Sequence, residues 1–320
     1  MSNSTKISLI IASLLTGLGV IVFVITMSVY GWNFNKLDNK KYNFNTYEIS
    51  NDFNSVKIDT ETADITILPS LDGKCKVECY EQEKVTHTVT TENDALIINV
   101  SDNRSWLDNL FNFKSQKVTV YLPKIEYSSI SIKEVTGNVN ISKNLNFNNI
   151  SVSVTTGDVK NYATVSETAN VETTTGDIIF ENITTNNLKI STTTGNVTLK
   201  GVSCLENIDI SVTSGDIEIE NVTCKNFESN GTTGEAELYN LIAVNGLKVE
   251  RVSGDVTFEK IEATQIIIQT NTGDIEGSIL TGKEFNVKTD TGDVKIPSSV
   301  TGSGVCKIET NTGDIKITIK

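Results

Sequence analysis

The chain has 320 residues, with 27 basic residues against 40 acidic ones and a formal net charge of −13. This charge opposes binding to nucleic acids, which depends on attraction to phosphate, so we expect no nucleic-acid partner. Only two arginines are present, Arg104 and Arg251, which disfavours bidentate recognition of phosphate or acidic sugars. Abundant Thr, Asn, Ile and Val with only three prolines predict a β-rich protein.

The N-terminal segment 1–31 is predicted to be a membrane anchor. Residues 7–30 carry no charge and are long enough to span a bilayer as a helix. No A-x-A-like cleavage site follows, which favours an uncleaved anchor over a secretory signal peptide. Three lysines after the segment outnumber Lys6, which by the positive-inside rule favours the opposite orientation, but long downstream domains translocate largely regardless of charge. We therefore expect a single-pass cell-membrane protein whose β domain lies outside the cytoplasm.

Residues 32–46 are interpreted as a tether, and residues 47–126 as an N-terminal β region with strand-like alternation. Within this region, segment 101–116 is unusually apolar and contains Trp106, Phe111 and Phe113. We expect it to cap the open end of the fold, and we keep these three aromatic residues as candidates for binding a partner. The only histidine of the chain, His87, is interpreted as an ordinary strand residue.

Residues 127–320 contain a Gly-centred signature that recurs at intervals of 19 to 21 residues. A fixed period of this length indicates a solenoid, in which each unit buries its apolar face against its neighbours. The prediction is an all-β, parallel β-solenoid of about ten coils behind an N-terminal transmembrane helix. The ten glycines are Gly137, Gly157, Gly176, Gly195, Gly215, Gly234, Gly254, Gly273, Gly292 and Gly313.

Alignment of the units on this glycine predicts which positions face inward. The residue two places after it is apolar in all ten units, and the residue five places before it is apolar in nine, Ser229 being the exception. This pattern predicts two short strands per coil around a Val/Ile core. The residue just before the glycine is always Thr or Ser, and its parity predicts an inward-facing ladder of hydroxyl groups.

The residue just after the glycine is Asp in seven units. Stacked carboxylates about 5 Å apart are compatible with bound calcium. We favour a structural role, in which Gly allows a tight corner and Asp satisfies the turn's own N–H groups, because Asn138 and Asn196 serve a turn equally well and a metal poorly. We therefore predict no metal and no cofactor. The structural pairs are Gly157 and Asp158, Gly176 and Asp177, Gly215 and Asp216, Gly254 and Asp255, Gly273 and Asp274, Gly292 and Asp293, and Gly313 and Asp314.

Two further features depart from the repeat. Arg251 falls in the coil directly over Gly231, where its side chain could form a notch or a bulge, and it is a candidate interaction residue, although a tolerated packing defect is the simpler interpretation. Cys204 and Cys224 share one offset in successive units, so stacking would bring them about 5 Å apart, close enough for a disulfide. Two free cysteines side by side in the core are the simpler interpretation.

The segment Val118-Thr119-Val120-Tyr121-Leu122-Pro123-Lys124, followed by repeated T-T-G-D-V/I units behind an N-terminal span, resembles the bacterial putative-adhesin family of β-strand-repeat domains of unknown function. The resemblance covers about residues 45–320. It implies a β-repeat fold in a small membrane-anchored protein, often encoded beside envelope-stress or regulatory systems. It carries no catalytic residues over to this chain.

These observations favour a non-catalytic, adhesin-like protein of the cell envelope that binds wall polymers or envelope proteins. One alternative is a regulatory partner of a membrane-bound envelope-stress sensor, which would make contact through the helix bearing Ser13 and Gly17. A polysaccharide-acting β-helix enzyme fits less well, since no acid and base pair stands out from the turn aspartates.

Overall fold

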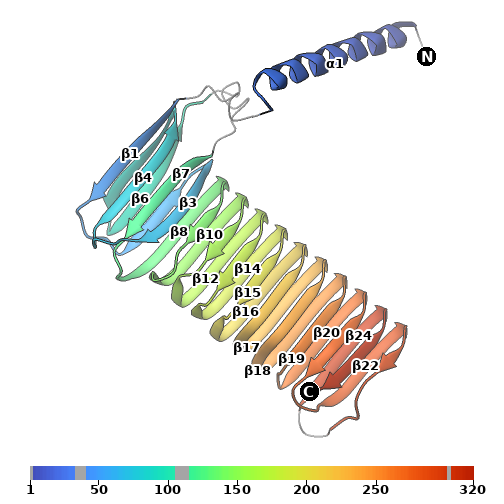
Figure 1. Ribbon diagram of the computed structural model, residues 1–320. Helices are drawn as coiled ribbons and strands as arrows, with labels where there is room; N and C mark the ends of the chain where they lie inside the picture. The colour runs from blue at the N-terminus through green and yellow to red at the C-terminus, as the bar shows by residue number, and fades with distance from the viewer. Residues whose placement is uncertain (1–2, 33–40, 105–114, 301–303) are drawn as a thin grey trace.

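The computed structural model describes residues 3–32, 41–104, 115–300 and 304–320. The chain begins with helix α1 (Asn3–Val29), which Figure 1 shows apart from the strands. Its segment Thr5–Val29 has a mean hydropathy of 2.6 and is long and apolar enough to cross a membrane. The described part that follows is almost entirely β-structure, which confirms the predicted fold class.

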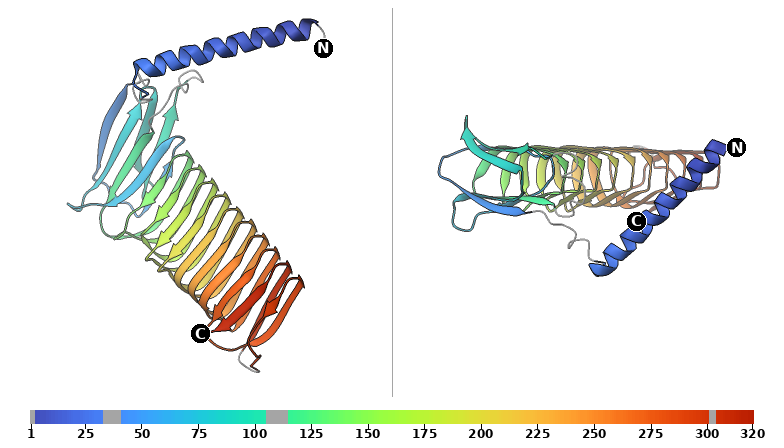
Figure 2. Two further views of the ribbon diagram at one scale, coloured as in Figure 1. Left: turned by 45° about the vertical axis from the view of Figure 1, so that its right-hand side comes forward. Right: turned by 90° about the horizontal axis from the view of Figure 1, so that it is seen from above.

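The strands form one continuous sheet that winds into two facing layers (Figures 1 and 2). The first layer contains, in spatial order, β1 (Tyr42–Ile49), β4 (Cys75–Gln82), β7 (Gln116–Leu122), β3 (Ala63–Pro69), β9 (Val139–Ile141), β11 (Val159–Asn161), β13 (Ile178–Glu181), β15 (Val197–Lys200), the first parts of β17 (Ile217–Thr233) and β18 (Ala236–Ser253), β19 (Val256–Ile261), β21 (Ile275–Ile279), β25 (Ile315–Ile319) and β23 (Val294–Lys295).

The second layer lies opposite the first. It contains β5 (Val85–Glu92), β6 (Ala95–Asp102), β2 (Ser55–Asp59), β8 (Glu126–Thr136), β10 (Asn146–Thr156), β12 (Thr164–Thr175), β14 (Thr184–Thr194), β16 (Ser203–Ser214), the second parts of β17 and β18, β20 (Gln265–Thr272), β24 (Val305–Thr312) and β22 (Glu284–Thr291). In most of the rod, one coil is therefore a long strand, a corner and a shorter strand, instead of the two short strands expected.

The core lies between the layers, where the aligned apolar positions meet. Val152 of β10 pairs in register with Val171 of β12, and Val159 of β11 with Ile178 of β13, and all four side chains are buried. Parallel, in-register stacking of branched side chains makes these columns apolar. Ser229, which is also buried, is the one polar residue in the column five places before the glycines.

The glycine corners explain the invariant residue of the repeat. Gly176 has φ +150°, and a Cβ on it would lie 2.0 Å from the carbonyl oxygen of Gly157 in the preceding coil. The other nine glycines of the column have φ between +128° and +157° and a distance of 2.0–2.1 Å to the corner of the neighbouring coil. Neither feature tolerates a side chain, so these ten corners exclude all other residue types.

Both ends of the rod contain a coil that is out of sequence order. At the C-terminal end, β24 lies between β20 and β22, as Figure 1 shows, and β25 lies between β21 and β23. At the N-terminal end, β2 lies between β6 and β8, and β3 lies between β7 and β9. The outermost C-terminal coil, β22 and β23, has a neighbour on one side only, which leaves Val294 45% exposed.

The N-terminal region continues the same two layers. Ala63 and Asp64 occupy the corner next to Gly137, with Ala63 in the place of the glycine. Strand β1 begins at Tyr42, inside the segment 32–46 assigned to the tether, because residues 42–49 pair antiparallel with β4. Antiparallel pairing is confined in this structure to β1, β4, β5 and their partners, so it distinguishes the region from the rod.

We predict that Gly176→Ala lowers the free energy of unfolding by about 3 kcal/mol or more, because the new methyl group meets backbone atoms that cannot move aside. Chemical denaturation measures the change. The matched control is Gly246→Ala, where the nearest atom to a new Cβ is 3.8 Å away. Equal effects of the two substitutions would contradict the steric explanation.

Candidate functional site

The aspartates of the repeat link one coil to the next. Asp158 Oδ1 accepts a hydrogen bond from the backbone N–H of Asp177 at 3.0 Å, and Asp177 Oδ1 accepts one from the N–H of Asn196 at 2.8 Å. Asn196 does the same for Asp216. The acceptor therefore serves the neighbouring coil, whereas a bond within its own turn was expected. Asn replaces Asp without loss because both side chains carry the required oxygen.

The same bond joins further corners along the rod. It connects Asp216 to Glu235, Asp255 to Asp274, Asp274 to Asp314 and Asp314 to Asp293. The last two bonds follow the spatial order of the coils and not their order in the sequence. The corner column predicted from Gly157, Gly215, Gly254, Gly273, Gly292 and Gly313 is thus a continuous ladder of close backbone contacts.

The Thr and Ser residues before the glycines face the solvent, so the predicted inward hydroxyl ladder at this position is wrong. Thr156, Thr175 and Thr194 are exposed, and so are the residues just before them. The alternation breaks because the chain turns the corner at these two positions. Each coil therefore presents two adjacent exposed side chains, of which at least one carries a hydroxyl group, and five of the ten coils present a pair of hydroxyl groups. We call this feature the hydroxyl edge; its central members are Thr155, Thr156, Thr174, Thr175, Thr193, Thr194, Thr213 and Ser214.

An inward hydroxyl ladder does exist two residues earlier. Thr173 and Thr192 are buried, and Thr173 Oγ1 donates to Thr192 Oγ1 at 2.8 Å. Thr270 Oγ1 donates to the carbonyl oxygen of Gly254 at 3.2 Å, and Thr310 Oγ1 does the same to Gly273 at 3.1 Å. These hydroxyl groups satisfy corner carbonyls inside the rod, so they stabilise the fold and are not available to a ligand.

Arg251 occupies this inward column and lies over Gly231 as expected. Its side chain is only 4% exposed, and a Cβ on Gly231 would lie 2.5 Å from Arg251 Nη1. The guanidinium donates to the Glu250 carbonyl at 3.1 Å and to Ser229 Oγ at 3.2 Å. Burial lowers the pKa of Arg251 to about 10. The side chain therefore fills the space left by Gly231, and contact with an external ligand would require it to leave the core.

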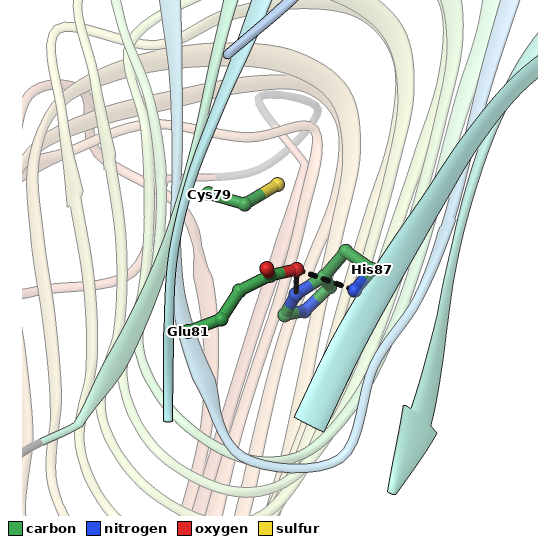
Figure 3. Close-up of side chains that lie close together, drawn as sticks. All are labelled: Cys79, Glu81 and His87. Atoms are coloured by element: carbon green, nitrogen blue, oxygen red, sulfur yellow. Dashed lines mark hydrogen bonds and ion pairs between the residues drawn. The ribbon is translucent and has the colours of Figure 1, made fainter. Parts of the chain in front are cut away.

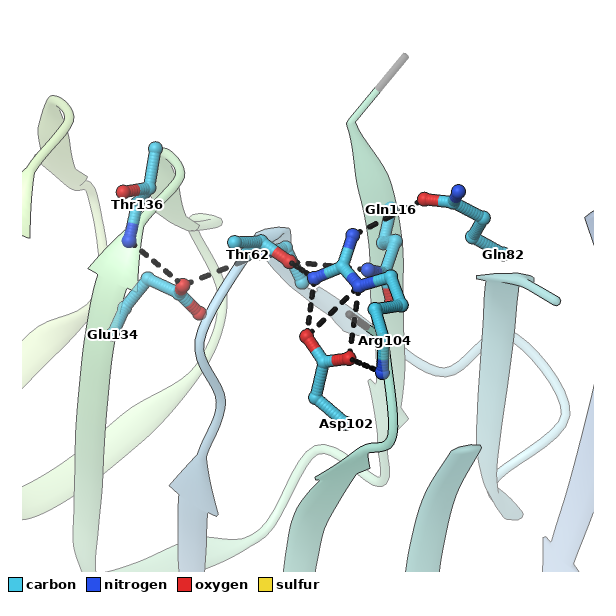
Figure 4. A network of polar contacts seen from close by, with 8 residues as sticks. Thr62, Gln82, Asp102, Arg104, Gln116, Glu134 and Thr136 are labelled. Atoms are coloured by element: carbon cyan, nitrogen blue, oxygen red, sulfur yellow. Dashed lines mark hydrogen bonds and ion pairs between the residues drawn. The ribbon is translucent and has the colours of Figure 1, made fainter. Parts of the chain in front are cut away.

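The aromatic residues proposed for binding, Trp106, Phe111 and Phe113, lie outside the described residues. The residues on either side of segment 105–114 belong to a polar network (Figure 4). Arg104 donates to Asp102 and, at 3.0 Å, to Thr62 Oγ1, which also accepts from Gln116 Nε2 at 3.1 Å. Arg104 and Gln116, on the two sides of this segment, thus meet at the corner of the β2 and β3 coil.

Glu134 marks the junction between this region and the rod, and it takes the place of Thr in the inward column. Its carboxylate accepts hydrogen bonds from Thr60 Oγ1 and from the backbone N–H groups of Ala63, Val135 and Thr136, the last three at 3.1–3.3 Å. Burial raises its pKa to about 7, although these four donors favour the charged form. Desolvation is therefore the larger of the two effects.

The structure brings together three residues that the sequence analysis did not connect. Cys79 and Glu81 of β4 and His87 of β5 are all at most 2% exposed, and one potential ligand atom of each lies within 4.8 Å of the others (Figure 3). The sequence did indicate that Glu81 faces inward, because Glu81 alternates along β4 in step with Val77 and Cys79. The position of His87 in the opposite layer had no counterpart in the spacing of the sequence.

All five cysteines are free and buried in the structure. Cys204 and Cys224 belong to neighbouring coils, and burial raises the pKa of the Cys224 thiol to about 12. These two residues are therefore small core side chains with unreactive thiols, in line with the simpler interpretation.

The fold and the corner geometry define a parallel β-solenoid protein with an N-terminal apolar helix. Residues 53–241 and 239–319 match the family described as Toastrack DUF4097, and the chain belongs to this family. This finding confirms the expected resemblance to the bacterial adhesin-like repeat proteins of unknown function.

Structure comparison finds several bacterial proteins similar to this chain. One, described as a putative adhesin from Bacteroides fragilis, is 16% identical with a TM-score of 0.43 over 87% of this chain and 97% of its own. Another, described as a putative lipid binding protein from Parabacteroides distasonis, is 19% identical with a TM-score of 0.49 over 75% of this chain and 97% of its own. No curated protein matches the chain in sequence. These similarities assign no function.

The pKa of Glu134 predicts a pH dependence of stability. Its folded pKa lies above the ordinary value near 4.5, so the stability that the protonated form contributes is full below about pH 4.5 and is lost as the pH rises to about 7. The loss amounts to about 3 kcal/mol at about 1.4 kcal/mol per pH unit. Unfolding measured from pH 4.5 to 8 should show this slope in the wild type and a flatter one in Glu134→Gln. The exposed Glu172→Gln is the control, and an unchanged slope in Glu134→Gln would contradict the assignment.

The contact between Gly231 and Arg251 predicts energetic coupling. Gly231→Thr alone should lower the free energy of unfolding by about 1–2 kcal/mol, because the new side chain displaces the buried guanidinium. The double variant Gly231→Thr with Arg251→Thr should recover this loss, since it recreates the pair of Thr173 and Thr192. A double-mutant cycle from denaturation curves measures the coupling. Additive effects within about 0.5 kcal/mol would show that the two residues do not interact.

Proposed function

We propose that this protein is a non-catalytic, membrane-anchored rod that presents a repeating polar surface to polymers or proteins of the bacterial cell envelope. The hydroxyl edge is the observation that carries the proposal. Coil after coil places exposed hydroxyl groups at one corner, and successive pairs are about 4.8 Å apart, the spacing of neighbouring strands. Such a row offers both donors and acceptors to a ligand that itself repeats, such as a wall polymer.

The helix and the overall charge support the same function. The segment Thr5–Val29 suits a single membrane span, which would hold the rod at the outer surface of the membrane. The net charge of −13 disfavours strongly acidic partners, so hydrogen bonding, and not charge attraction, would hold the ligand. The turn aspartates have a structural role in this proposal, because one oxygen of each already accepts a hydrogen bond from the next coil.

A set of four substitutions at the hydroxyl edge tests the proposal: Thr155, Thr174, Thr193 and Thr213, each changed to Val. Val keeps the shape and the strand preference of Thr but removes the hydroxyl group. We expect the full-length protein in detergent to be retained on purified cell wall, and the variant to bind at least tenfold more weakly, since four lost hydrogen bonds of about 0.5 kcal/mol each give about 2 kcal/mol.

The matched control replaces four exposed threonines away from the hydroxyl edge, Thr164, Thr184, Thr223 and Thr257, by Val. Retention like that of the wild type is expected for this control. Equal losses in both variants, or no retention of the wild type, would contradict binding through the hydroxyl edge. Protease treatment of intact cells tests the location. Cleavage of the rod is expected, and protection until lysis would place the rod in the cytoplasm.

A further inference from the structure

The cluster of Cys79, Glu81 and His87 combines three kinds of metal ligand inside the N-terminal β region. Cys79 and Glu81 are two residues apart on β4, so both side chains point to the same side of the strand, into the space between the layers. His87 lies on β5 in the opposite layer and faces them, as Figure 3 shows. The three side chains are 0%, 2% and 1% exposed, and their potential ligand atoms lie within 4.8 Å of one another.

The hydrogen bonds around the cluster leave one nitrogen without a partner. His87 Nδ1 lies 2.9 Å from Glu81 Oε1, and the backbone N–H of His87 donates to the same oxygen. His87 Nε2 is buried without any hydrogen-bond partner in the structure. Because Nδ1 is the ring nitrogen that faces the carboxylate, an ion shared by Glu81 and His87 would bind Nδ1, in place of the hydrogen bond that joins the two side chains.

Strand β1 also contacts the cluster. The side-chain amide of Asn45 donates a hydrogen bond to the Glu81 carboxyl group. Tyr47 approaches from the same strand, β1, and its hydroxyl donates to the His87 carbonyl at 3.1 Å. Burial lowers the pKa of His87.

We propose that Cys79, Glu81 and His87 form a binding site for a divalent transition-metal ion of the zinc type. A thiolate, an imidazole and a carboxylate are the ligands that Zn²⁺ takes in proteins, and a water molecule would complete four-coordination. Binding converts the Cys79 thiol to a thiolate and releases its proton to the solvent. One doubly charged ion would balance the charges of the bound thiolate and carboxylate.

The site would join the two layers where the sheet has only antiparallel edge strands. Among the described strands, β1 and β5 are the outermost of their layers, each paired along one side, and the hydroxyl of Tyr47 on β1 donates to the carbonyl of His87 on β5. A metal bridge between β4 and β5 would therefore replace part of the cross-linking that the stacked coils supply elsewhere. Because the ligands are buried, the ion would enter while the layers close during folding.

Cobalt substitution tests the site directly. The full-length protein is produced in minimal medium in which Co²⁺ replaces zinc, so that the ion is present during folding, and is then purified in detergent. We expect about one Co²⁺ per chain and a thiolate-to-cobalt charge-transfer band in the near ultraviolet. Absence of both from the folded wild-type protein would overturn the proposal without any variant.

Substitutions assign the ligands. Cys79→Ser and His87→Gln should each reduce the metal content at least tenfold. The matched control is Cys75→Ser, because Cys75 lies on the same strand, is also buried, and does not belong to the cluster. It should retain both the metal and the absorption band. Persistence of the band in Cys79→Ser, or its loss in folded Cys75→Ser alone, would exclude Cys79 as the sulfur ligand.

Discussion

The close approach of backbone to backbone at the glycine corners is the constraint on which the rod depends. Each corner carbonyl lies where a side chain of the next coil would begin, so the ten repeat coils can stack only with Gly at this point. With the corner fixed, neighbouring strands come into register and their Val and Ile side chains form continuous columns. The same turn directs the two preceding residues outward, which creates the hydroxyl edge as a consequence of the packing.

The arrangement of the strands at the two ends of the rod covers the terminal regular coils of the stack. A solenoid whose last coil simply stopped would leave that coil held on one face by its predecessor alone. Here the coil of β24 and β25, which carries the C-terminus, is held on both faces, between β20 and β22 and between β21 and β23. The coil of β2 and β3 is enclosed in the same way at the other end. The chain therefore protects the first and last regular coils by folding a later or an earlier segment over them.

The sequence predicted those features that depend on the repeat alone: the solenoid, the inward apolar columns and the glycine corners. The sequence did not predict the features that the repeat period leaves undetermined. The outward turn of Thr156 depends on the corner, where simple alternation ends. The spatial order of the last two coils could not be predicted from the sequence. The units around Gly292 and Gly313 have the same motif at the corner, and either of them could stack on the unit around Gly273. Glu81 and His87 meet across two layers, and no sequence spacing encodes that contact.

Residues that depart from the repeat pattern pack against neighbours that also depart from it. Arg251 replaces a small side chain in the inward column, and the residue next to it in the preceding coil is Gly231, which gives it room. Glu134 replaces a hydroxyl group, and the coil beside it supplies Thr60 and the N–H of Ala63 as donors. Because each coil contacts only its neighbours, such exchanges stay local and leave the corner unchanged. The rod can thus vary inside while its outer edge stays periodic, and the chemistry that occurs only once lies in the N-terminal region, where the repeat gives way to antiparallel strands.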